Sequence, residues 1–187
     1  MYKIVLKRFF RLEGVVEFVS SGSRLRIYIP KETAIISFIV GGINCPRNAR
    51  TAPGVTNASE EPFGSEAAAF TKKLVLQRDV EIEIEGVDKL GNFIGHLFVS
   101  REGGGLSHNL AELLLEQGLA ELHVSAEKFV YFKSMSAAEK RAKDARRNLW
   151  TMYKEDIPIE DSVEVQHETP DRKVNYKKVV VTEIVKV

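Results

Sequence analysis

Apolar and polar positions in the first forty residues alternate in a pattern that predicts three successive β-strands. Leu12–Val19 is rich in β-branched residues, with Gly14 as the expected site of a β-bulge. Ser20–Ser23 supply a hairpin turn, and Ile35–Val40 forms a third, largely apolar strand. Residues 24–29 form the middle strand, with Leu25, Ile27 and Ile29 on one face and Arg24, Arg26 and Tyr28 on the other.

The next part of the chain predicts one helix and a second hairpin. Ser65 is expected to cap a helix in which Ala67, Phe70 and Leu74 share one face. Val80–Ile84 and Phe93–Val99 are then two strands joined by a turn at residues 87–92.

Two further helices complete the pattern. Ser107 or Asn109 begins the first, which ends at Gly118 because a glycine suits the left-handed position after a helix. Its inward residues are expected to be Leu110, Leu113 and Leu114. The second is a longer helix from Ser125 with one continuous apolar stripe, made of Phe132, Met135, Ala138, Ala142, Ala145 and Leu149.

This order predicts an α+β protein dominated by a β-barrel, with five strands and three helices as in a decorated oligonucleotide-binding (OB) fold. We expect one domain over residues 1–151, beginning with a basic and aromatic segment at 1–11. An acidic linker would follow at 152–174. The apolar run at 175–187 would be the first strand of a further, truncated unit.

Composition adds little to this picture. The 187 residues are 44% hydrophobic and 28% charged, with a net charge of +1. Residues 1–150 hold 21 basic and 18 acidic residues, so the body is mildly basic and permits a phosphate-binding face without requiring one. No apolar run approaches the ~20 residues that span a bilayer, and a single cysteine makes no internal disulfide, so we expect an intracellular protein away from membranes.

Two basic segments are candidates for phosphate contact. Phe9 and Phe10 lie among basic residues, which suits base stacking, although packing on a neighbouring domain is the favoured interpretation. In the last helix the basic residues more usually form a solvated face, and phosphate contact is the alternative. These helix residues are Lys140, Arg141, Lys143, Arg146 and Arg147.

Chemistry is expected in the long loop after the third strand, Asn44–Gly64. It begins with an amide, a thiol and a guanidinium, from Asn44, Cys45 and Arg47, and these offer no carboxylate for a metal or for activating water. Cys45 has no histidine near it in sequence, so we interpret it as an unreactive thiol. The four histidines lack metal-ligand spacing, and Gly103–Gly105 lacks the lysine of a phosphate loop.

Several blocks resemble staphylococcal nuclease. Gly64–Val75 (GSEAAAFTKKLV), Leu113–Ala120 (LLLEQGLA) and Asn148–Trp150 (NLW) are similar to its three helices. Arg8–Glu17 (RFFRLEGVVE) and Tyr176–Ile184 (YKKVVVTEI) resemble a narrower group, the Tudor staphylococcal nuclease coactivator family. This resemblance implies a fourth nuclease-like barrel, a linker, and the first strand of a split fifth unit.

The resemblance also implies where the nuclease's working residues would fall. Its two calcium-binding aspartates correspond to Ser23 and Asn44, and its general-base glutamate to Arg47. Its two phosphate-gripping arginines correspond to Ile39 and Asn92. Of the compared positions, Lys89 beside the nucleotide pocket keeps its type. On this basis we expect no catalytic residue, no metal and no cofactor.

The leading hypothesis is a catalytically degenerate module that binds RNA and scaffolds proteins. The resemblance implies a larger transcriptional coactivator and RNA-silencing-complex component, cytoplasmic and nuclear, with neighbouring nuclease-like and Tudor domains and other ribonucleoprotein or transcription proteins as partners. One alternative is a calcium-dependent endoribonuclease for single-stranded or edited RNA, with Glu60 or Glu61 as acid. Another is a purely protein-binding platform. The candidate RNA-binding residues are Arg24, Arg26, Arg47, Arg50, Lys89, Lys140, Arg141 and Lys143.

Overall fold

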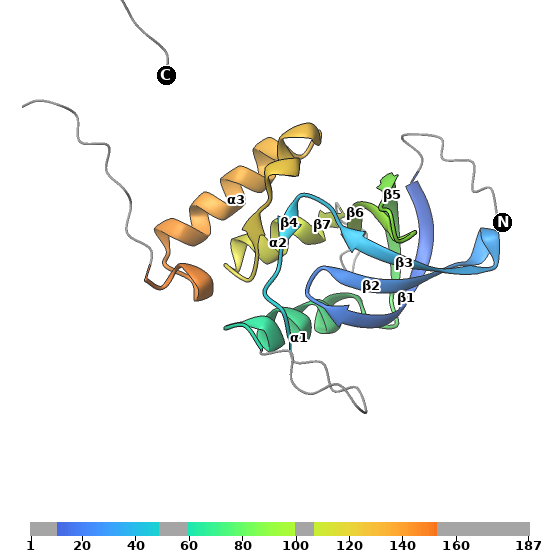
Figure 1. Cartoon of the computed structure of the whole chain (residues 1–187), viewed down its shortest axis with the longest axis horizontal. Coiled ribbons are helices and arrows are strands. Elements are labelled where there is room, and N and C mark those ends of the chain that lie inside the picture. Colours follow the sequence, from blue (N-terminus) through green and yellow to red (C-terminus); the bar gives the residue numbers. More distant parts are fainter. Residues whose placement is uncertain (1–10, 49–59, 100–106, 153–187) are drawn as a thin grey trace, which may run out of the picture. The chain divides into compact units, whose positions relative to one another are not determined.

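A computed structural model describes residues 11–48, 60–99 and 107–152 of the chain (Figure 1). The chain divides into two units, Met1–Lys154 and Glu155–Val187, and all described residues lie in the first. The predicted segments at 1–10, 100–106 and 153–187, together with Arg50, lie outside the described residues. The predicted domain boundaries therefore stay predictions.

Five long strands form a closed barrel. They are β1 (Arg11–Ser21), β2 (Arg24–Ile29), β3 (Ala34–Val40), β5 (Asp79–Val87) and β6 (Phe93–Val99). Neighbours pair antiparallel in the order β3-β2-β1-β5-β6, and a parallel pairing between β3 and β6 closes the ring. Three two-residue strands of the described residues are additional to the prediction: β4 (Ile43–Asn44) pairs with β8 (Glu121–Leu122), and β7 (His108–Asn109) pairs antiparallel with the end of β6.

Three α-helices cover the barrel in the described part of the chain, as predicted. α1 (Gly64–Val75) packs on β1, α2 (Leu110–Glu116) packs on β6, and α3 (Phe132–Asp144) packs on α2 (Figure 1). A buried hydrogen bond from Thr71 Oγ1 to the Gly22 carbonyl, 2.9 Å long, fixes α1 to the β1–β2 turn. No helix within the described ranges is both long and apolar enough to cross a membrane.

The barrel interior is filled by the residues that strand alternation predicts. On β2, Leu25, Ile27 and Ile29 are buried, whereas Arg24 and Arg26 are exposed. The predicted end signals of α2 are confirmed. Asn109 accepts a hydrogen bond from the Ala111 N–H, and Gly118 takes a positive φ of 66° after the helix.

Two predictions about β1 and α1 are wrong. Gly14 pairs regularly with Val80 and is no bulge, and it is needed because a Cβ there would lie 2.6 Å from Ile27 Cγ2. The irregularities fall later in β1, between Val16 and Phe18 and between Val19 and Ser21. Ser65 does not cap α1. The helix begins at Gly64, after Phe63 in the left-handed conformation.

The predicted long helix from Ser125 is divided into three pieces. A short 3₁₀ helix at Val124–Lys128 precedes α3, and another at Asn148–Trp150 follows it. α3 stops at Asp144, and Arg146 and Asn148 take positive φ values of 48° and 43°. Met135, Ala138 and Ala142 of the predicted stripe are buried, whereas Ala145 is exposed. The turn folds back on α2, since Leu149 N–H donates to the Gly118 carbonyl at 3.1 Å.

Gly95 stands where three strands approach most closely. It faces Val40 of β3 and Ile84 of β5, and its carbonyl accepts a 2.7 Å hydrogen bond from Gly41 N–H. A Cβ on Gly95 would lie 1.9 Å from the Glu83 carbonyl oxygen, a contact that only backbone movement relieves. The closure of the barrel therefore requires glycine at this position.

We expect Gly95→Ala to lower the free energy of unfolding by about 2–4 kcal/mol, because β5 must move away from β6. Gly86→Ala on the same hairpin is the matched control. A Cβ at Gly86 meets nothing within 4 Å, so this change should stay within about 0.5 kcal/mol of the parent. Urea unfolding followed by circular dichroism measures both, and equal stabilities for the two variants would refute the close-approach argument.

Candidate nucleic-acid interface

A cleft of about 500 Å³ lies beside the β1–β2 turn, the end of β3 and the segment that leads to α1. Gly41 and Gly42 turn the chain out of β3, and Pro46 follows in the next extended segment. The residues that line the cleft are Ser20, Ser21, Ser23, Arg24, Ile39, Ile43, Asn44, Cys45, Pro46, Arg47, Asn48 and Glu61.

Four of the five positions carried over from the nuclease line this one cleft. They are Ser23, Ile39, Asn44 and Arg47. Asn92 is not among the lining residues. It lies in the β5–β6 turn, where its side-chain amide donates to Asp88 Oδ2 at 2.7 Å and its main-chain N–H donates to Asp88 Oδ1 at 2.8 Å. These hydrogen bonds lower the pKa of Asp88. They also hold the Asn92 side chain within its own turn.

The donor set in the cleft does not fit calcium. At the two positions implied for its ligands stand the hydroxyl of Ser23, which is nearly buried, and the neutral amide of Asn44. Glu61 is the one carboxylate among the described residues that line the cleft. Calcium takes six to eight oxygens, several of them anionic. Across residues 11–48, 60–99 and 107–152, no three His, Cys, Asp or Glu side chains gather to hold a metal ion.

Arg47 and Glu61 bind each other across the base of the long loop. Arg47 N–H donates to Glu61 Oε2 at 2.9 Å, and Arg47 Nε lies 3.8 Å from Glu61 Oε1. The main chains are also joined, because Glu61 N–H donates to the Arg47 carbonyl at 2.9 Å. Gly64 lies against the same carbonyl, where a Cβ would come within 2.2 Å of the oxygen. Glu61 is thus paired with Arg47, the residue at the position that the resemblance assigns to a general base.

Cys45 is buried at the edge of the cleft, against Gly22. Burial raises the pKa of its thiol to about 12, although a hydrogen bond with Ser23 opposes the shift. A nucleophilic cysteine needs a lowered pKa and a nearby base. The environment therefore agrees with an unreactive thiol.

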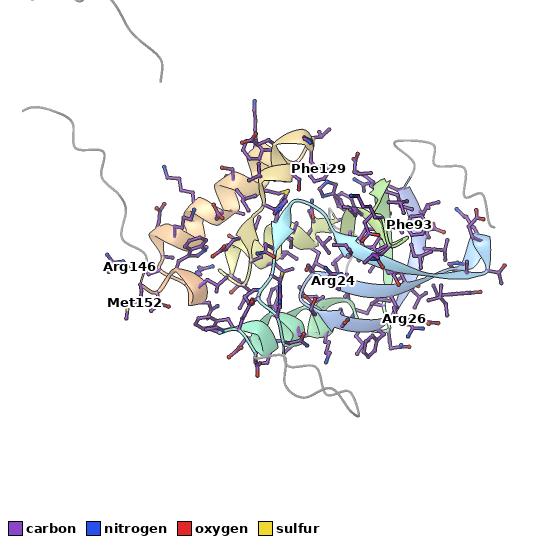
Figure 2. All side chains as sticks on the ribbon, viewed as in Figure 1. Arg24, Arg26, Phe93, Phe129, Arg146 and Met152 are labelled. Carbon is purple, nitrogen blue, oxygen red and sulfur yellow. The ribbon has the colours of Figure 1, made fainter. Side chains whose placement is uncertain are left out.

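The predicted basic residues do not form one surface. Arg24 lines the cleft, and Arg26 is exposed two residues along β2 on the same face. Lys89 is exposed in the β5–β6 turn, next to Asp88, whose pKa Arg24 helps to lower. Figure 2 shows Arg24 and Arg26 on the barrel, well apart from Arg146 beyond the end of α3.

Two of the three candidate cations on α3 are engaged within the domain. Lys143 Nζ lies 2.8 Å from the carboxylate of the buried Glu139 and 4.4 Å from the Trp150 ring centroid. Arg141 Nε lies 3.2 Å from Glu116. Lys140 is exposed. Charge density on this helix therefore overstates the charge offered to a ligand.

Phe18 is a candidate that sequence reasoning missed. The irregular register after Val16 sets Phe18 opposite Arg26, and 52% of its surface is exposed. It lies two residues from Ser20, which lines the cleft. Plain alternation would bury a phenylalanine at this place, and a β-bulge that reverses its direction leaves no signal in a single sequence.

Residues 37–152 match the family described as "Staphylococcal nuclease homologue". The chain belongs to this family. Staphylococcal nuclease domain-containing protein 1 of Drosophila melanogaster is 47% identical over 184 residues, which cover 95% of this chain and 19% of that protein. Ribonuclease TUDOR 1 of Arabidopsis thaliana is 36% identical over 181 residues, which cover 96% of this chain and 16% of that protein.

The chain is also similar to a bacterial nuclease. Thermonuclease of Staphylococcus hyicus is 25% identical over 97 residues, which cover 51% of this chain and 54% of that protein. The described residues are thus a staphylococcal-nuclease-like domain of the Tudor staphylococcal nuclease (Tudor-SN) type, built on the OB-fold barrel that the sequence predicted. The chain spans no more than about a fifth of the length of these Tudor-SN relatives.

We expect Cys45 to react slowly with iodoacetamide in the folded domain. At pH 8 a thiol with a pKa of about 12 is ionised in roughly one molecule in ten thousand, and burial restricts access further. Mass spectrometry should show alkylation at least about a hundredfold slower than in guanidinium-unfolded chain, where the pKa is near 8.5. Because the chain has one cysteine, the unfolded protein is its own control, and equal rates would contradict the buried placement.

Proposed function

We propose that this Tudor-SN-type domain binds single-stranded RNA at the cleft and does not cleave it. The observation that carries the proposal is the Arg47–Glu61 pair in the cleft, because Arg47 stands at the position that the resemblance assigns to the general base. The charged groups of this cleft have the wrong chemistry for hydrolysis.

The loss of cleavage follows from protonation. A general base must accept a proton from water, and a guanidinium keeps its own protons at any physiological pH. Ile39, which stands at the position of a phosphate-gripping arginine, is half-buried and pairs with Ile94 of β6. Without bidentate arginine contacts, the charge that develops on phosphate in the transition state is not stabilised.

The binding of RNA is supported by what surrounds the cleft. Arg24 and Arg47 offer cations to phosphate groups, and the neighbouring serine and asparagine side chains are neutral hydrogen-bonding groups. Phe18 and Arg26 are paired across β1 and β2, and each lies two residues along its strand from a residue that lines the cleft. An exposed aromatic ring beside an arginine suits an unpaired base and its phosphate, which favours single strands over duplex.

The wider role is part of the same proposal. The length of the relatives, of which the chain spans 19% and 16%, supports a place for this domain inside a larger protein. Further nuclease-like and Tudor domains are its proposed neighbours. In that setting it would contribute RNA binding and protein scaffolding to a coactivator or RNA-silencing assembly in the cytoplasm and nucleus. The assignment as the fourth barrel remains a prediction.

One observation favours a second function. Glu61 places a carboxylate in the cleft, and one Tudor-SN relative is named a ribonuclease. If another part of the cleft supplied a base, Glu61 would be the first acidic residue to test in a calcium-dependent endoribonuclease. Its pairing with Arg47 weighs against this function, because the carboxylate oxygens already face the main-chain N–H and the guanidinium of Arg47.

Fluorescence anisotropy of a labelled single-stranded RNA at several salt concentrations, with calcium present, tests the proposal. We expect affinity to fall steeply as salt rises, and a denaturing gel of the same samples to show intact RNA. Shortened RNA that calcium chelation protects would establish the ribonuclease function instead. An RNA that is neither bound nor cleaved would favour the protein-binding platform.

We expect Phe18→Ala to weaken RNA binding by about tenfold, since base stacking on an aromatic side chain is worth ~1–3 kcal/mol. Ile35→Ala is the matched control. Ile35 is 51% exposed but lies at the opposite end of β3 from the cleft-lining Ile39. The same anisotropy titration measures both variants, and an equal loss for the two would remove Phe18 from the interface.

A further inference from the structure

We propose that Arg47 forms a phosphate subsite that Glu61 fills in the free domain, so that Glu61 is an internal competitor of RNA. The inference rests on the proposed function, because the phosphate it assigns belongs to the bound RNA strand. The inference gives the Glu61 carboxylate a regulatory role, whereas the ribonuclease alternative would give it a catalytic role.

The geometry of the pair is that of a bound anion. Each carboxylate oxygen of Glu61 faces a different donor of Arg47: Oε2 accepts the main-chain N–H at 2.9 Å, and Oε1 lies 3.8 Å from Nε. Main-chain N–H groups and guanidinium groups are both common donors to phosphate oxygens in proteins. A phosphate with two free oxygens can therefore replace the carboxylate on the same two donors.

The carboxylate is not needed to hold the loop together. The main chains of Arg47 and Glu61 are linked by their own 2.9 Å hydrogen bond, and Gly64 N–H donates to the Glu61 carbonyl at 3.0 Å. Gly64 also packs against the Arg47 carbonyl. The Glu61 side chain can thus swing away while the backbone that presents Arg47 stays in place.

Exposure makes the exchange easy. The Arg47 side chain is 82% exposed and that of Glu61 is 50% exposed, and exposed ion pairs contribute little to stability. Glu61 therefore sets a modest electrostatic barrier that an RNA phosphate must overcome.

Glu61→Gln tests the inference against Glu60→Gln, which removes the same charge from the adjacent, exposed residue. We expect Glu61→Gln to tighten binding of labelled single-stranded RNA about three- to tenfold at low salt, and Glu60→Gln to change it less than about twofold. In an Arg47→Gln background, which removes the guanidinium but keeps the main-chain N–H, the difference between the two glutamine variants should become smaller. Equal effects of both variants in the parent domain would overturn the inference.

A titration with inorganic phosphate, followed through the Arg47 amide signal by NMR, separates this inference from the proposed function. The amide should shift at lower phosphate concentration in Glu61→Gln than in the parent or in Glu60→Gln. That result supports the subsite even if the parent binds no RNA, an outcome that would refute only the proposed function. An Arg47 amide that phosphate leaves unchanged in all three proteins would refute the subsite.

Discussion

The parallel pairing of β3 with β6 is the constraint on which the rest of the domain depends. Without it the five strands would be an open sheet with two unpaired edges, and the register Val40↔Gly95 closes that sheet into a barrel. Closure also fixes where β3 ends. Gly41 is hydrogen-bonded to Gly95, so the chain leaves the barrel at this point and enters the segment that lines the cleft. A glycine in the middle of β6 is thus a condition for the site as well as for the fold.

The cleft separates what the fold positions from what particular side chains can do chemically. Position in the fold is set by strand register and loop geometry, which tolerate exchange of polar side chains at the rim. Hydrolysis, in contrast, depends on particular ionisable groups at short distances. In this domain the carboxylate of Glu61 is paired with Arg47. The proposed binding of phosphate needs only hydrogen-bond donors and positive charge, which Arg24 and Arg47 supply in the cleft.

Helix α3 illustrates why charge counted along a sequence is a poor guide to charge presented to a ligand. Lys143 serves the buried Glu139, whose other carboxylate oxygen accepts the Leu122 N–H at 2.8 Å and so ties α3 to β8. Arg141 binds Glu116 of α2. The Glu139 and Arg141 contacts join α3 to β8 and to α2. Basic residues that suggest a charged surface in the sequence are therefore engaged within the domain. Among the described residues, the cations that line the cleft are Arg24 and Arg47.

The sequence by itself determined the five long strands, the inward face of β2 and the ends of α2, because these follow from local periodicity and from turn and cap chemistry. It was wrong where a distant contact overrides a local preference. α1 starts at Gly64 because the Arg47 carbonyl lies against it, and the helical stripe after Asp144 breaks because the chain turns back onto α2. The outward turn of Phe18 and the meeting of Arg47 with Glu61 were decided only by the tertiary structure. Both depend on strand register and loop closure, which bring together backbone segments whose proximity one sequence does not encode locally.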